Sequence, residues 1–150
     1  TPTFRALVAA DIPDLSSTYT TTTTYNNAVL DSGWVDWSNT STIVGWSSFT
    51  NKLIRYRRVG KMVFVNVDLQ GTSNSTAATF TLPYALGSSA FAVVPLMFTA
   101  NSGTFTIGGY AVISGSTATI WRWTNINSTS SSWTASGTKI ATGQFFYVIN

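Results

Sequence analysis

Short apolar runs separated by turn-forming residues recur along the chain from Asp31 onward. Apolar and polar residues alternate within several of these runs, and none keeps the 3.6-residue period of an amphipathic helix. The strand-like runs are STIVGWSSF, LIRYRR, MVFVNVDLQ, ATFTLP, AFAVVPLMFTA, TFTIGGYAVIS, ATIWRW and GQFFYVIN. Roughly eight short strands with Gly-, Asn- or Ser-rich segments between them predict an all-β fold, an antiparallel β-sandwich or jelly roll. We expect this domain to span residues 31–150.

Residues 1–30 follow a different pattern and predict an extended N-terminal arm or linker. The run FRALVAADIPDL has the composition of a turn or two of helix, which Pro13 would end. The run SSTYTTTTTYNN is rich in β-branched threonine, which favours extended backbone and offers little apolar surface to bury. Such an arm acts as a linker or orders against another chain. Because the sequence starts without Met, we interpret it as part of a longer or processed protein.

A basic stretch precedes the most apolar run. Five of the eight positive charges are Lys52, Arg55, Arg57, Arg58 and Lys61. A hairpin with a Val59-Gly60 loop would pair Arg57 with Met62. Its two faces would then carry Ile54, Tyr56, Val63, Val65 and Val67 on one side and Arg55, Arg57, Met62, Phe64 and Asn66 on the other. This alternation favours a solvated strand face; contact with phosphate, an acidic saccharide or an Asp of a neighbouring subunit stays open.

A second hairpin follows from the sequence YAVISGSTATIWRW. A Gly115-Ser116 loop would pair Ile113 with Ala118 and Ala111 with Ile120, which makes a plausible core face. The opposite face would bring Tyr110 beside Trp121, and Trp123 beside Gly108. Aromatic side chains on a non-core face need an explanation. Burial under a loop or second sheet, a subunit contact and sugar stacking are the three alternatives.

Composition narrows the function classes. Charged residues make up only 9% of the chain and the net charge is +3, so the surface is expected to be hydroxylated and largely neutral. The chain has no Cys, no His and no Glu, and its carboxylate side chains are Asp11, Asp14, Asp31, Asp36 and Asp68. Most hydrolytic mechanisms and metal sites need groups that this set lacks. We expect a non-enzymatic protein without cofactor or metal, without a nucleic-acid partner and without membrane insertion.

Six tryptophans supply the candidate binding residues. Sugar rings pack their C–H faces on indole while their hydroxyls need polar partners beside the ring. The first candidates are Trp34, Asp36 and Trp37 in DSGWVDWSN, and Asn127 and Trp133 in NSTSSSWTASG; the second candidates are Trp121, Arg122 and Trp123. Asp31 and Asp36 would act as a glycosidase pair only if the pKa of one carboxyl were raised.

Three segments resemble proteins of bacteriophage tails. PTFRALVAADIPDLSSTY resembles a segment that lies between the shaft and the distal part of such proteins. YRRVGKMVFVNVDLQGTSNSTAATFTLPYAL is similar to a module of phage tail-fibre and receptor-binding proteins, and GQFFYVIN is similar to the last strand of such modules. Together the three segments cover most of the chain. We carry no functional residue over from the family to a position of this sequence.

The resemblance implies a homotrimeric tip exposed on the virion and assembled in the host cytoplasm. Such a tip would bind a host cell-surface saccharide or protein and would contact other tail proteins through its N-terminal side. A chain without cysteine is compatible with folding in a reducing compartment and working outside it. The alternative is a carbohydrate-binding module of a secreted glycan-active enzyme, which would share the β-sandwich and the Trp-rich loops.

Overall fold

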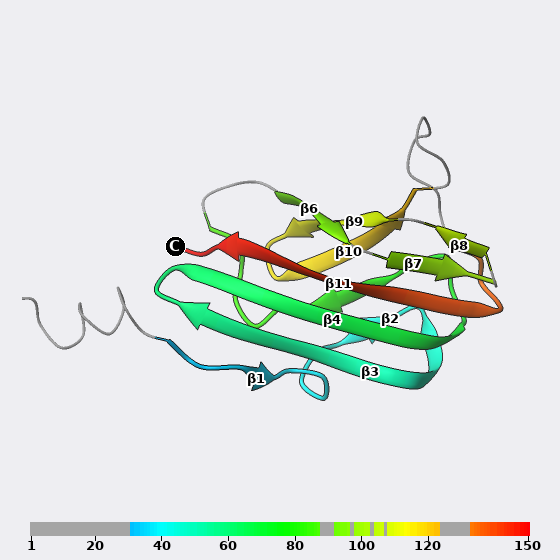
Figure 1. The fold of residues 1–150 in the computed structure, drawn as a ribbon, viewed down its shortest axis with the longest axis horizontal. Helices are drawn as coiled ribbons and strands as arrows, with labels where there is room; N and C mark the ends of the chain where they lie inside the picture. The colour runs from blue at the N-terminus through cyan, green and yellow to red at the C-terminus, as the bar shows by residue number, and fades with distance from the viewer. Residues whose placement is uncertain (1–30, 88–91, 97, 103, 107, 124–132) are drawn as a thin grey trace, which may run out of the picture.

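A computed structural model describes residues 31–87, 92–96, 98–102, 104–106, 108–123 and 133–150. Two antiparallel sheets form a sandwich, which confirms the predicted all-β fold (Figure 1). The large sheet has the strand order β1-β3-β4-β11-β7-β8, and the small sheet has the order β2-β5-β10-β9-β6. The predicted arm, residues 1–30, lies outside the described residues.

The strands are β1 (Val35–Asp36), β2 (Ile43–Val44), β3 (Trp46–Val59), β4 (Met62–Ser73), β5 (Thr79–Thr81), β6 (Ala92–Leu96), β7 (Phe98–Asn101), β8 (Thr104–Thr106), β9 (Gly109–Ser114), β10 (Thr117–Arg122) and β11 (Thr138–Val148). Several predicted runs are therefore divided between sheets. The run AFAVVPLMFTA contains β6 of the small sheet and β7 of the large sheet. In the described part of the chain there is no helix long and apolar enough to cross a membrane.

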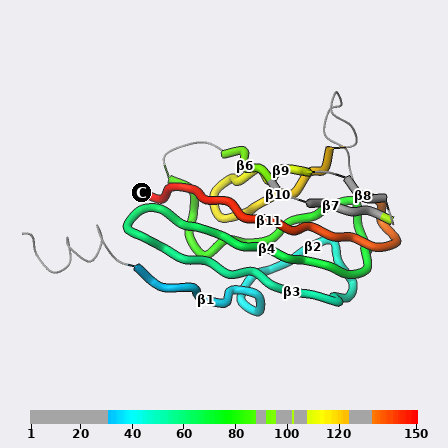
Figure 2. Tube along the Cα trace, viewed as in Figure 1, coloured from blue at the N-terminus to red at the C-terminus, as the bar shows by residue number. Residues whose placement is uncertain are grey.

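β3 and β4 form a long hairpin in the large sheet, and β11 pairs with β4 on the side opposite β3 (Figure 2). β4 pairs with β11 from Thr72↔Thr138 to Met62↔Val148, along almost the full length of both strands. β11 pairs with β7 over a shorter stretch that ends at Thr142↔Phe98. The C-terminal half of β11 thus reaches beyond β7, towards the opening between the two sheets.

The turn between β3 and β4 differs from the prediction. Val59 pairs with Met62 and Arg57 with Phe64, so the two loop residues are Gly60 and Lys61. Gly60 has a φ of 58°, a value that glycine adopts without steric cost. The predicted Val59-Gly60 loop was wrong: it would pair each β3 residue with a β4 residue two positions before the observed partner. Because side chains alternate with a period of two, this shift leaves each residue on its predicted face.

The hairpin of β9 and β10 confirms the predicted register. Ile113 pairs with Ala118, Ala111 with Ile120, and Tyr110 with Trp121. The Trp123 backbone N–H donates to the carbonyl oxygen of Gly108 at 3.4 Å, which also matches the expected neighbours.

The core between the sheets is built from alternate residues of both layers. The largest contributors from the large sheet are Ile54, Val63, Val65, Val67, Leu69, Phe145 and Tyr147. The small sheet contributes Phe80, Ala111, Ile113, Ala118 and Ile120. The rings of Phe80 and Phe145 meet across the layers with centroids 6.4 Å apart. Burial of the predicted core face of each hairpin therefore holds the two sheets together.

β3 is one strand where the sequence predicted two, because bulges let it follow β4. The register shifts between Trp46 and Ser48 and again between Phe49 and Asn51. Opposite these shifts, a Cβ atom added at Gly71 would lie 1.9 Å from the carbonyl oxygen of Ser48. The absence of a side chain at Gly71 allows the backbone of β3 to approach β4 this closely.

Candidate functional site

The structure places Trp133 in the core and packs the half-buried Trp37 against it. Trp133 is 3% exposed, and its Nε1 donates to the carbonyl oxygen of Ile120 at 2.9 Å. Trp37 packs against the core, and its Nε1 donates to the carbonyl oxygen of Thr81 at 3.1 Å. Each indole N–H has a backbone partner inside the fold, so these side chains anchor loops. A buried Trp133 has no free face on which a sugar ring could stack.

A buried lysine explains why Trp133 points inward. The Lys139 ammonium lies 5.0 Å from the ring centre of Trp46 and 5.3 Å from that of Trp133. Its Nζ atom donates to the carbonyl oxygens of Ser75 and Ala77, both at 2.7 Å. Two indole faces and two carbonyls thus compensate a positive charge that is fully buried. The sequence signal for this cluster is slight, since Lys139 falls on the inward-facing series of β11 and is otherwise an ordinary strand lysine.

Trp34 and Asp36, in contrast, are exposed. Trp34 is 49% exposed at the edge of the large sheet, and the Arg55 guanidinium lies 5.7 Å from its ring centre. Asp36 pairs with Arg55 in register, and its Oδ1 accepts the backbone N–H of Ser38 at 2.8 Å. Asp36 therefore caps the turn that leads away from β1, and Trp34 remains free for contact with another molecule.

The carboxyl groups of Asp31 and Asp36 stay ionised. The guanidinium of Arg57 forms an ion pair with Asp31 and lowers the pKa of that carboxyl. Hydrogen bonds from Ser38 lower the pKa of Asp36. A general acid of a glycosidase needs a raised pKa, so this pair has the opposite electrostatic character. Within the described ranges, three or more acidic side chains do not come together as a metal site would require.

The outward face of the large sheet carries a cluster of apolar side chains, called here the outer patch. Phe64 of β4 and Phe146 of β11 are paired in register, and their rings lie 6.1 Å apart. The next row towards the β3–β4 turn consists of Val59, Met62 and Val148. Together with Trp34 these side chains form the outer patch: Trp34, Val59, Met62, Phe64, Phe146 and Val148.

Two hollows lie on the outer patch and share Trp34 and Phe64. One of about 450 Å³ is lined by Trp34, Arg57, Val59, Met62 and Phe64. A smaller one of about 200 Å³ lies beside Phe146 and Gln144. Trp34 therefore forms a common wall, and the lining is mainly apolar.

The outward face of the small sheet carries a second aromatic cluster, called here the aromatic ledge: Tyr110, Trp121 and Trp123. Trp123 is 45% exposed, and its ring lies 6.0 Å from that of Tyr110 at an interplanar angle of 41°. Tyr110 and Trp121 are cross-strand partners and are half-buried. The neighbouring outward row contains Val112, Thr119 and Thr79, so hydroxyl groups lie beside Trp121 and an apolar side chain lies beside Tyr110. The ledge combines flat apolar faces with nearby polar groups.

Two predicted binding residues remain, Arg122 and Asn127. Arg122 follows Ala118 and Ile120 on the inward side of β10, and burial lowers the pKa of its guanidinium. Asn127 lies outside the described residues. The structure therefore does not bring Trp34 and Trp133 into one site: the first lies on the large sheet's outward face and the second lies inside the sandwich.

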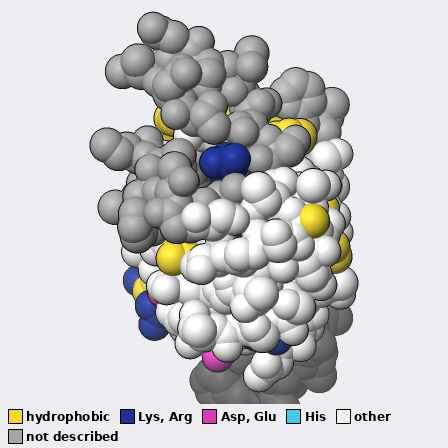
Figure 3. Space-filling model, turned by 90° about the vertical axis from the view of Figure 1, so that its right-hand side faces the viewer, with side chains coloured by type: hydrophobic (Ala, Val, Ile, Leu, Met, Phe, Trp, Pro, Cys, Tyr) yellow, Lys and Arg dark blue, Asp and Glu magenta, His cyan; other side chains and the backbone are white. Residues whose placement is uncertain are grey.

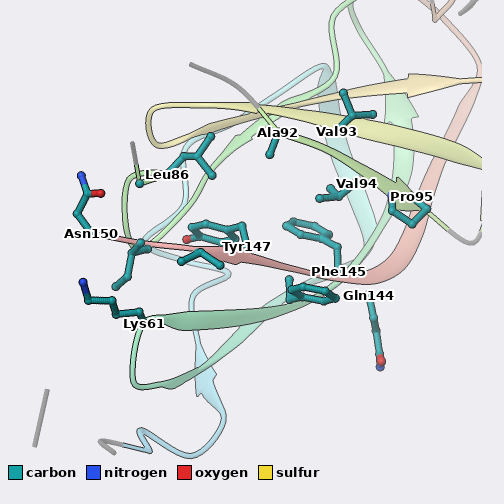
Figure 4. A pocket seen from close by; sticks show the side chains of 14 residues that line it. Lys61, Leu86, Ala92, Val93, Val94, Pro95, Gln144, Phe145, Tyr147 and Asn150 are labelled. Carbon is teal, nitrogen blue, oxygen red and sulfur yellow. The ribbon is translucent and has the colours of Figure 1, made fainter. Parts of the chain in front are cut away.

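A groove lies between β6 of the small sheet and the C-terminal half of β11 in the large sheet (Figure 4). It has a volume of about 730 Å³, and its walls include Ala92 and Val94 of β6 and Phe145 and Tyr147 of β11. The Tyr147 hydroxyl donates to the carbonyl oxygen of Tyr84 at 2.9 Å, which closes the inner end. Lys61 is the one charged side chain among its described lining residues.

The end of the sandwich opposite the C terminus is mostly uncharged (Figure 3). Lys and Arg side chains appear there in a few separate places among uncharged polar side chains and backbone. This surface agrees with the hydroxylated, neutral character predicted from composition. The described part of this end offers neither a broad basic patch nor a broad apolar one.

The chain matches no protein-family model, no curated protein and no solved structure at a significant level.

Proposed function

We propose that this chain is a non-enzymatic attachment module, the distal tip of a bacteriophage tail fibre, exposed on the virion. In this proposal it binds a saccharide or protein on the host cell surface, and its N-terminal side contacts other tail proteins. Copies of the tip would be assembled as a homotrimer in the host cytoplasm. The sequence resemblance motivates the biological setting, and the surface chemistry supports a binding role.

The observation that carries the binding role is the aromatic ledge. Nearly half of the Trp123 side chain is exposed, although the opposite face of the same sheet packs against the apolar core. Trp and Tyr provide large contact area and still offer a polar atom, which suits them to ligand contact at a wet surface. The two rings of Trp123 and Tyr110 are tilted towards each other and form a shallow corner. A sugar ring stacked on Trp123 would have the Tyr110 hydroxyl as a hydrogen-bonding neighbour.

The rigid support of the ledge favours recognition. β9 and β10 are held in register along six residue pairs, and on their opposite face Ala111, Ile113, Ala118 and Ile120 are fully buried. An aromatic side chain on such a strand loses little conformational freedom when it binds. One stacked ring contributes on the order of 1 kcal/mol beyond area burial, so a single ledge binds weakly. Several copies on one fibre would convert weak sites into firm attachment through avidity.

The experiment uses the full chain with a fluorescent label, incubated with a panel of bacterial strains and with polysaccharide extracted from each strain. We expect saturable binding to a subset of strains, loss of that binding for Trp123→Ala, and no new reducing ends in the polysaccharide. If the protein binds none of the strains that the parent phage infects, the attachment role is contradicted. New reducing ends would contradict its non-enzymatic character.

The same ledge is compatible with a carbohydrate-binding module of a secreted glycan-active enzyme. That alternative predicts binding to a purified polysaccharide, without regard to bacterial strain. Competition separates the two: a tail-fibre tip should block adsorption of the phage to its host, whereas a carbohydrate-binding module should not. Trp123→Ala serves as the matched control protein in both assays.

A further inference from the structure

Exposed apolar side chains are unevenly divided between the two outward faces. Among the described residues, eight large hydrophobic side chains are exposed, and the large sheet carries five of them: Trp34, Val59, Met62, Phe146 and Val148. They form adjacent rows across β3, β4 and β11, with the partly buried Phe64 between them. The other three, Val44, Val93 and Trp123, lie on the small sheet. The outer patch is therefore a concentrated feature of one face.

The outer patch is also local within the large sheet. One row further from the β3–β4 turn, the outward residues are Arg55, Asn66 and Gln144. The following row contains Asp68 and Thr142, whose side chains are hydrogen-bonded to each other at 2.7 Å. Leu53 of β3 shares that row, and Ile140 of β11 lies in the row beyond it, but both side chains are half-buried. The exposed large apolar side chains of this face are therefore confined to the end of the sheet near the β3–β4 turn. Packing among the described residues does not account for the apolar rows, because the core lies on the opposite face.

The exposed apolar area of the outer patch is large enough for the apolar centre of a protein interface. Phe146 is 57% exposed, and an aromatic side chain presents about 150–250 Å², so Trp34 and Phe146 together leave roughly 200 Å² accessible. The three aliphatic members raise the total to the order of 400 Å², about half of the ~800 Å² that one partner buries in a standard interface. An apolar centre of that extent with a polar rim is the usual anatomy of such an interface.

The rim charges favour a second copy of the same chain. Arg55 and Arg57 border the outer patch, and so do Asp31 and Asp36. Arg57 forms an ion pair with Asp31, and Arg55 lies across from Asp36 in register. A rim with both signs of charge is complementary to a rotated copy of itself, whereas a ligand of one charge would meet repulsion on part of the rim.

We infer that the outer patch is the surface through which copies of this chain pack against one another. Met62, Phe64, Phe146 and Val148 would form the apolar centre of the interface, and Trp34 would close its edge beside Arg55. This inference rests on the homotrimer of the proposed function, for which it names the interface, but it does not depend on the attachment role. It leaves the aromatic ledge, on the opposite side of the sandwich, free for a ligand.

The first test measures the mass of the full-length protein by analytical ultracentrifugation over a range of concentrations. The double variant Phe146→Thr/Val148→Thr keeps β-branched residues on the strand and removes the apolar centre. The matched control is Val93→Thr, because Val93 is 58% exposed and Val148 is 51% exposed, on opposite sheets. We expect the double variant to raise the dissociation constant of the oligomer at least tenfold and the control to leave it unchanged.

The second test does not depend on the stability of the double variant. The chain has no cysteine, so Val148→Cys and Val93→Cys each introduce a single thiol. We expect the thiol at position 148 to react with a water-soluble maleimide at least tenfold more slowly in concentrated than in dilute protein. The thiol at position 93 should react at one rate throughout.

A wild-type protein that stays monomeric at high concentration would overturn the inference. So would equal maleimide rates for the two thiols, or equal dissociation of the double variant and the control. A monomeric wild type whose cell binding is abolished by the double variant would assign the outer patch to a host protein instead. Loss of the attachment function alone, with concentration-dependent protection at position 148, would leave the interface standing.

Discussion

The indole N–H of Trp133 donates a hydrogen bond to the carbonyl oxygen of Ile120 at 2.9 Å, between the two sheets. This bond, with Lys139 above the same ring, makes Trp133 a structural residue. Trp133→Ala should therefore lower the free energy of unfolding by about 3–5 kcal/mol, the usual cost of removing a buried Trp side chain. Urea denaturation gives the value.

Trp123→Ala is the matched control for that measurement, since its side chain is 45% exposed. We expect it to change the free energy of unfolding by less than about 1 kcal/mol. Similar losses of stability in both variants would contradict the assignment of Trp133 to the core and Trp123 to the surface.

Lys139 makes the stability of the fold depend on pH. Burial lowers the pKa of Lys139 to about 8, from 10.5 for a solvated lysine. Between these values the unfolded chain holds more protons than the folded chain, so the free energy of unfolding should rise with pH. The slope should approach but not exceed about 1.4 kcal/mol per pH unit.

Tyrosine limits this rise. Burial raises the pKa of Tyr147 and Tyr56 above the ordinary value of 10.0. The unfolded chain then loses the phenol protons first, so the free energy of unfolding should fall again above about pH 10. Urea denaturation of the wild type and of Lys139→Met across this range checks both effects. A rise between pH 8 and pH 10 that persists in Lys139→Met would show that another group causes it.

The substitution Gly71→Ala tests the close approach of the β3 and β4 backbones. A Cβ atom at position 71 would lie 1.9 Å from the carbonyl oxygen of Ser48, so Gly71→Ala must push two backbones apart. We expect a loss of about 1–3 kcal/mol in the free energy of unfolding, typical of overpacking. Thr72→Ala, at the adjacent exposed position, should cost less than about 0.5 kcal/mol. Equal, small effects of the two changes would mean that the bulges of β3 adapt without strain.

The two hairpins show how far the sequence predicts the fold. In the β9–β10 hairpin the predicted Gly115-Ser116 turn was correct, and so was the register that places Ala111, Ile113, Ala118 and Ile120 on one face. In the β3–β4 hairpin the sequence RVGKM permits a turn at either of two positions, and both give the same faces. Periodicity therefore fixed the faces, while the register depended on which side of Gly60 the turn begins.

The candidate site was less predictable, because an indole's surroundings come from distant strands. Trp133 lies in a Ser-rich segment that is typical of a loop, but Lys139 and Trp46 draw it into the core. Trp37 shares its polar context with Trp34, but its bond to Thr81, 44 residues away, and its ring contact with Tyr56 place it against the core. The face of β4 that carries Met62 and Phe64 was predicted to be a solvated strand face, and the outer patch became apparent only from the pairing of β4 with β11.

The central claim is that the aromatic ledge attaches this protein to host cells while the outer patch joins its copies. The most direct measurement is a binding isotherm of the wild type, Trp123→Ala and Val93→Thr on a strain that the wild type binds. The account predicts that Trp123→Ala weakens binding at least fivefold, about 1 kcal/mol for one lost ring. It also predicts that Trp123→Ala keeps the wild-type oligomer mass and that Val93→Thr binds as the wild type does. Wild-type binding by Trp123→Ala would contradict the claim.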